Sequence, residues 1–134
     1  MAQGGLRVID LGACRTALAT ALRSAELNVS DGGDLVPNGA SIGPFVCSYH
    51  RTIGGSDHVG LTVAGCEVRV VTDRADEASA YGRLDAAMTH LPPIIETAPG
   101  PWHALVVQSA RPDSPLQVGE ASYASLALII ELHV

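Results

Sequence analysis

The chain has 134 residues, of which 14 are acidic and eight are basic, and its formal net charge is −6. An acidic surface of this kind excludes a protein that holds nucleic acid by neutralising its phosphates, because that mode of binding needs clustered cations. Hydrophobic residues make up 47% of the chain, which excludes intrinsic disorder and predicts one domain with its own core.

Three cysteines, Cys14, Cys47 and Cys66, are widely spaced and form no CxxC pair. Neither a zinc site nor a disulfide framework is indicated, and each is predicted to be a small buried apolar residue. The sequence shows no secretory signal pattern and no apolar run of the length that spans a membrane. We therefore expect folding in a reducing cytoplasm.

The first predicted element is an amphipathic helix. Residues 1–9 are predicted to be a flexible N-terminal arm, and residues 10–134 form a single domain. Asp10 is placed to cap the helix, which is predicted to end near Glu26. Its apolar residues recur every three or four positions, at Leu11, Cys14, Leu18, Leu22 and Ala25.

A hairpin is predicted next. Residues 29–44 are rich in glycine and proline and are predicted to be an irregular loop. Residues 45–52 alternate as a strand, residues 53–57 form a Gly-Gly hairpin tip, and a second strand begins at His58.

That second strand changes phase. Its apolar positions are odd-numbered up to Val63 and even-numbered from Cys66 onward. We interpret this as one long strand with a β-bulge at Gly65, in preference to a tight hairpin at Ala64-Gly65.

The long strand leads directly into a second helix. Apolar residues fall at helical spacing from Ala80 to Leu91. Thr72 or Asp73 is predicted to cap this helix, with Asp76 in its first turn, and Pro92-Pro93 is predicted to end it.

The C-terminal region is predicted to hold two main strands. After a linker through Pro99-Gly100-Pro101, residues 102–109 form a strand, residues 111–115 a turn and residues 116–118 a short strand. Residues 123–134 form a long strand whose inward positions are Leu126, Leu128, Ile130, Leu132 and Val134. The order of elements predicts an α+β fold: a mainly antiparallel sheet with two helices packed on it and a long hairpin arm.

Catalytic motifs are missing from the sequence: it has no phosphate-binding loop, no HExxH and no nucleophile elbow. His50 and His58 flank one hairpin and would suit a metal pair, but no third ligand lies in sequence reach. Asp73, Asp76 and Glu77 fit a charged first turn of a helix better than an acid–base cluster. We expect no enzymatic activity, no cofactor and no metal.

Two residues have both a structural and an interface interpretation. Arg74 would form an ion pair with Asp73 or Asp76, or lie on the rim of a subunit contact. Trp102 would either lie in the core at the start of a strand or anchor an interface. With the exposed hairpin tip, the candidate subunit-interface residues are Gly54, Gly55, Asp57, Arg74, Asp76 and Trp102.

The layout of residues 10–134 resembles the tail terminator proteins of long-tailed bacteriophages. The matching features are the amphipathic N-terminal helix, a Gly/Pro-rich stretch before Pro44-Phe45-Val46, and a hairpin with a Gly-Gly tip. The run from Val70 to Ala75, VVTDRA, then enters a helix, and two strands close the chain.

The resemblance implies a structural function in the virion, after assembly in the host cytoplasm. Such proteins form a ring, usually a hexamer, that caps the tail tube and ends its polymerisation. One face contacts the tail-tube protein, the other contacts the head-completion or connector protein, and DNA passes through the lumen without specific binding. The alternatives are a tail-tube or head–tail connector subunit and, in a different class, a small α+β metal- or ligand-binding enzyme.

Bulky replacements of Gly54 and Gly55 should leave folding nearly intact and block assembly, because the tip is expected to be exposed. The yield of infectious particles measures this. A normal yield from the double variant would show that the tip makes no essential contact.

Overall fold

The structure is a computed structural model that describes residues 10–29, 35–51 and 59–133. Its elements are α1 (Leu11–Ser24), β1 (Asn28–Val29), β2 (Gly39–Ile42), β3 (Val46–Arg51), β4 (Val59–Val71), α2 (Glu77–Glu96), β5 (Ala104–Val118) and β6 (Ala121–His133). The predicted arm at residues 1–9 and the hairpin tip with Gly54, Gly55 and Asp57 lie outside the described residues. Within these three ranges, neither helix has the length and apolar character needed to cross a membrane.

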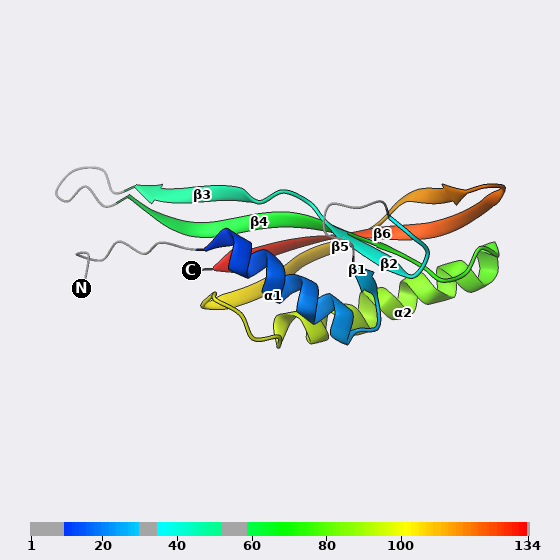
Figure 1. Ribbon diagram of the computed structural model, residues 1–134, viewed down its shortest axis with the longest axis horizontal. Coiled ribbons are helices and arrows are strands. Elements are labelled where there is room, and N and C mark those ends of the chain that lie inside the picture. Colours follow the sequence, from blue (N-terminus) through cyan, green and yellow to red (C-terminus); the bar gives the residue numbers. More distant parts are fainter. Residues whose placement is uncertain (1–9, 30–34, 52–58, 134) are drawn as a thin grey trace.

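The predicted α+β class is confirmed. Six strands form one sheet in the order β1-β2-β4-β6-β5, and β3 also pairs with β4. All pairs are antiparallel except β1 with β2. The two helices lie together on one side of the sheet, with the β3–β4 pair running toward one end of the molecule and the β5–β6 hairpin toward the other (Figure 1).

The core lies between the helices and the near face of the sheet. Alternate residues of β4 and β6 are buried there, and the four described inward positions predicted for the last strand are confirmed. The helices add Cys14, Leu18 and Leu22 from α1 and Leu84, Leu91 and Ile95 from α2. The strand residues in this cluster are Ala64, Cys66, Val68, Val70, Leu126, Leu128, Ile130 and Leu132.

The first helix forms as predicted. The Asp10 carboxylate accepts a hydrogen bond from the Ala13 amide at 3.0 Å, which caps the amino end. Arg15, in the first half of the helix, donates to the carbonyl oxygens of Ile42 at 2.8 Å and Gly43 at 3.2 Å. This side chain therefore ties α1 to the bend between β2 and β3.

The prediction of an irregular loop over residues 29–44 is wrong in part, because it contains the end of β1 and all of β2. In β2, Ala40 pairs with Val70 and Ile42 with Val68. A Cβ on Gly39 would lie 2.6 Å from the Val36 carbonyl oxygen, so this glycine permits a close approach of two backbone segments. Residues 39–42 form a strand because they pair with β4, which is far away in the sequence. Their local composition is typical of a turn.

β4 is one continuous strand, as predicted, but the bulge is not at Gly65. Gly65 pairs in register with Val46 on one side and Glu131 on the other. The irregularity lies earlier, where Ser48 pairs with Val63 and the next residue of β3 pairs with Leu61. One extra residue of β4, at position 62, therefore causes the change of phase.

Two predictions about α2 are wrong. Its N-cap is Asp76, whose carboxylate accepts from the Ser79 amide at 3.2 Å, and not Thr72 or Asp73. The helix also continues through Pro92 and Pro93 to Glu96. Leu91 and Ile95 are one turn apart and both buried, and their burial offsets the two hydrogen bonds lost at the prolines.

The predicted turn at residues 111–115 is instead part of β5, which runs as one strand with register shifts after Val107 and after Asp113. Pro112 is tolerated because β5 is the outermost strand, where a missing N–H breaks no ladder. The Glu96 carboxylate accepts a hydrogen bond from the Val107 amide at 2.9 Å. The start of this edge is therefore covered by α2.

Replacing Leu128 with Ala should cost about 2–5 kcal/mol of unfolding free energy, because its side chain is fully buried between sheet and helices. Ile129, its neighbour on the opposite face, is only partly buried. Ile129→Ala should therefore cost clearly less in urea denaturation. Equal costs would contradict the one-sided core.

Candidate interaction surface

Both described helices, α1 and α2, lie on one side of the sheet, and neither covers its far face (Figure 1). Its residues alternate along the strands with those of the core, so they point away from the helices. The central row comes from β6, and the flanking rows come from β4 and β5. We call this surface the open face, and it includes Glu67, Arg69, Ser109, Arg111, Asp113, Ser125, Ala127, Ile129 and Glu131.

Charged side chains on the open face are largely paired with one another. Arg69 lies 3.6 Å from the Asp113 carboxylate and donates to the Ser114 carbonyl oxygen and, at 3.4 Å, to the Ser125 hydroxyl. Arg111 lies 4.0 Å from Glu67. These pairs are partly exposed and add little stability, but they give the face a polar, nearly balanced surface.

One part of the open face is hollow and apolar. Val46, Gly65 and Glu131 are neighbours across β3, β4 and β6. Because Gly65 has no side chain, a shallow depression of about 470 Å³ opens between its neighbours. Val46 stands at its edge with 72% of its surface exposed, the largest exposure among the described large hydrophobic residues.

Carboxylates and aliphatic side chains surround this hollow. Its lining includes Pro44, Val63 and Ile129, with Glu67 and Glu131 among the charged groups. Gln108 donates to the Glu131 carboxylate, and His133 Nε2 lies 3.8 Å from it. An apolar floor beside two acids suits an apolar segment that carries a cation.

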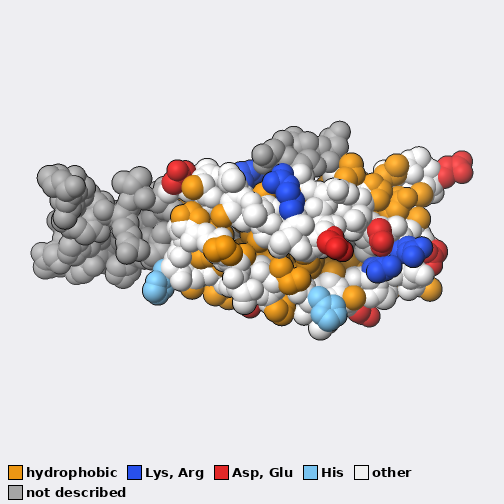
Figure 2. Space-filling model, turned by 60° about the horizontal axis from the view of Figure 1, so that its bottom comes forward, with side chains coloured by type: hydrophobic (Ala, Val, Ile, Leu, Met, Phe, Trp, Pro, Cys, Tyr) orange, Lys and Arg blue, Asp and Glu red, His pale blue; other side chains and the backbone are white. Residues whose placement is uncertain are grey.

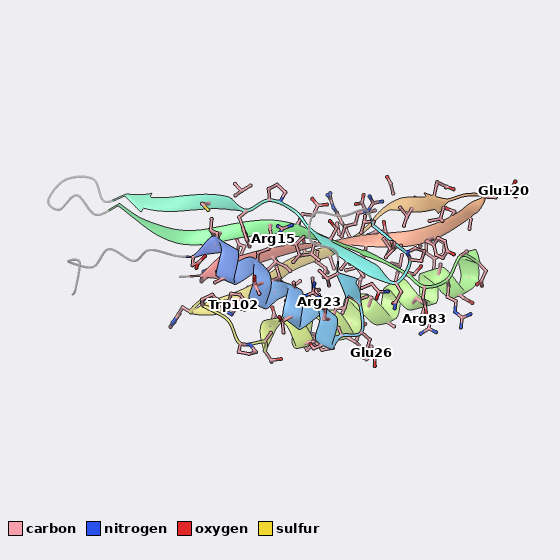
Figure 3. The ribbon with its side chains drawn as sticks, viewed as in Figure 1. Arg15, Arg23, Glu26, Arg83, Trp102 and Glu120 are labelled. Carbon is pink, nitrogen blue, oxygen red and sulfur yellow. The ribbon has the colours of Figure 1, made fainter. Side chains whose placement is uncertain are left out.

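A second depression of about 340 Å³ lies on the helix side, between α2 and the turn after α1. Glu26 at this turn and Asn38, which directly precedes β2, both have positive φ, 65° and 56°. The Asn38 side-chain amide donates to the Glu26 carbonyl oxygen at 3.2 Å. At its rim, Asp73 lies 3.5 Å from Arg83. Arg23, Glu26 and Arg83 follow one another along the helix side in Figure 3.

The strand–helix junction holds two of the predicted interface residues. Hydrogen bonds from Ser79 hold the pKa of Asp76 below its usual range, and the nearby charge of Arg74 adds to the effect. Arg74 is exposed and close to Asp76, whereas Asp73 pairs with Arg83. The prediction that Asp76 belongs to an interface stays a prediction, and its observed contact is a helix cap.

Trp102 lies at the other end of α2 from this junction, so among the described residues the structure does not bring Trp102 together with Arg74 and Asp76. Its ring is partly buried against the core, and β5 begins two residues later, at Ala104. A Cβ on Gly100 would clash with the ring, so the indole covers the backbone there. This placement favours the core interpretation. Trp102 and the hairpin residue Glu120 lie toward opposite ends of the molecule (Figure 3).

Charged, apolar and histidine side chains are interspersed on the helix side, without one continuous patch of a single kind (Figure 2). Across the described ranges, no three His, Cys, Asp or Glu side chains come together as a metal site would require. The predicted pairing of His50 with His58 lies outside the described side chains. Burial raises the pKa of the Cys66 thiol to about 11, so this thiol is protonated near neutral pH.

No protein-family model and no curated protein matches the chain. Among the solved structures similar to this chain, one of a protein without a functional name aligns over 92% of this chain and 93% of its own length. The identity is 15% and the TM-score is 0.45.

The hollow at Gly65 was not predicted. The sequence offers a signal for it, a glycine inside a strand, which we interpreted as a bulge. Only the register shows that the residues on both sides of Gly65 stay paired, so that the missing side chain becomes a gap in the surface.

Asp76→Ala should lower the melting temperature at pH 7, because the helix loses its cap. Since the folded pKa of Asp76 is lowered, its stabilisation is complete above the unfolded pKa and lost as pH falls through the folded one. The difference between wild type and variant should therefore shrink in acid. A difference that stays constant into strong acid, well below the usual pKa of an aspartate, would contradict the role of the ionised carboxylate.

Proposed function

We propose that this protein is a structural subunit of a bacteriophage tail, a tail terminator that forms a ring on the end of the tail tube. The observation that carries the proposal is the order of elements over residues 10–134. A helix precedes a hairpin whose long strand leads into a second helix, and two strands close the chain. The same order is typical of the tail terminator family described above.

The distribution of surfaces supports assembly into a closed ring. The molecule is elongated along its strands, and its two ends are different: β3 and β4 run to one, and the β5–β6 turn lies at the other (Figure 1). A head-to-tail contact between unlike surfaces closes into a ring when the rotation fits. The exposed side chain of Val46 and the two depressions are surfaces on which such contacts can form.

The charge of the chain agrees with a DNA conduit. The net charge is −6, and Arg69 and Arg111 on the open face are each close to a carboxylate. Phosphates would therefore find few unpaired cations among the described residues of this face. In the proposed ring, tail-tube protein binds one side and a head-completion or connector protein the other.

A tail-tube or head–tail connector subunit is the nearest alternative, because it would also assemble into rings. A small α+β enzyme or ligand-binding protein that uses His50 and His58 is the alternative from another class. Stoichiometric zinc binding that raises the melting temperature would favour the latter.

The proposal is tested by adding the purified protein to growing tail tubes and measuring tube length by electron microscopy. A tail terminator should cap the tubes and shorten the length distribution, and concentrated protein should show closed rings with a hole that admits duplex DNA. Leu128→Asp serves as the unfolded control. Tubes that lengthen as they do without the protein would overturn the assignment to a terminator.

A further inference from the structure

The hollow on the open face exists because Gly65 has no side chain. A Cβ on Gly65 would meet only the carbonyl oxygens of Ile130 at 3.6 Å and Val46 at 3.8 Å, which are ordinary contacts. Gly65 is not among the glycines with positive φ. The backbone therefore does not demand glycine here, and a Cβ added at this position would make no clash.

The side chains that line the hollow indicate which kind of segment would bind there. Val46 and Ile129 provide apolar contact surface, and Glu67 and Glu131 stand among the lining residues. The side chains of these acids are 46% and 34% exposed. An occupant with apolar residues on both sides of one cation would match both features.

The chain itself contains such a segment. Its first nine residues, MAQGGLRVI, place Arg7 between Leu6 and Val8, and Ile9 follows. This segment lies outside the described residues and joins α1 at Asp10. Nine extended residues span at most about 30 Å, which is enough to reach a neighbouring subunit.

We propose that residues 1–9 of one copy bind the hollow at Gly65 of a second copy. Leu6 and Val8 contact Val46 and Ile129, and Arg7 lies between Glu67 and Glu131. A segment of one subunit that enters a different surface of the next makes a head-to-tail contact. The inference rests on the proposed ring and names one contact that would join its subunits.

The position of α1 favours a second copy over the segment's own chain. α1 packs on the helix side of the sheet, and Arg15 holds it to the bend at Ile42 and Gly43. The hollow lies on the opposite face. A segment that starts on the helix side would have to pass around the sheet edge to reach its own hollow, whereas a neighbour can present the open face directly.

The first test is the self-association of the full-length chain, measured by light scattering and native mass spectrometry over a concentration series. Gly65→Val, which fills the hollow, and a chain without residues 1–9 should each weaken association at least tenfold. Gly82→Ala, on an open surface of α2, is the matched control and should associate as the wild type does. Circular dichroism checks that each variant is folded.

Unchanged association of folded Gly65→Val or of the shortened chain would overturn the proposal, as would a wild-type chain that stays monomeric throughout the series. If the contact is present but tail tubes are not capped, the contact stands and the proposed function fails. If rings cap tubes equally well with Gly65→Val, the function stands and the contact fails.

The second test is a disulfide between two separately purified chains. Leu6→Cys mixed with Val46→Cys should give a cross-linked dimer on a non-reducing gel. Leu6→Cys mixed with Glu120→Cys, at the end of the β5–β6 hairpin, or with wild type, should not. If the double variant carrying Leu6→Cys and Val46→Cys forms only a disulfide within one chain, the segment binds its own hollow and the proposal is wrong.

Discussion

The pairing of β4 with β6 is the constraint on which the rest of the structure depends. The two strands stay in register from Val63 and His133 to Val71 and Ser125. Because side chains alternate along a strand, this register places Val68 and Leu128 together in the core and leaves the intervening residues on the open face. A slip of one residue would exchange the two sets, burying charges and exposing leucines.

The same register gives the sheet two chemically different faces. One face is covered by α1 and α2 and forms the core. The other carries paired charges, such as Arg69 with Asp113, that are partly exposed to solvent. Long charged side chains also shield small central residues: Ala127, flanked in register by Arg69 and Arg111, is fully buried although neither α1 nor α2 lies on this face. On this mostly polar face, the hollow at Gly65 and the exposed side chain of Val46 form a site for an apolar contact.

Predictions succeeded where local signals and tertiary contacts agree. The cap at Asp10 and the spacing of Leu18 and Leu22 define α1, and even-numbered leucines define β6, because both patterns match the face that is buried. They failed where a distant partner outweighs local composition. Glycine-rich β2 is a strand because β4 pairs with it, and α2 continues past two prolines because Ile95 reaches the core.

The sequence by itself determined the α+β class, the core faces of α1 and β6 and the absence of a recognisable catalytic motif, since hydrophobic period and motif spacing are local properties of the chain. Only the tertiary structure decided that Asp76 rather than Thr72 caps α2, that the extra residue of β4 is at position 62, and that Gly65 opens a hollow. The physical reason is that these features depend on which residues lie opposite one another across strands. Pairing of that kind joins positions far apart in the chain and leaves no periodic signature in it.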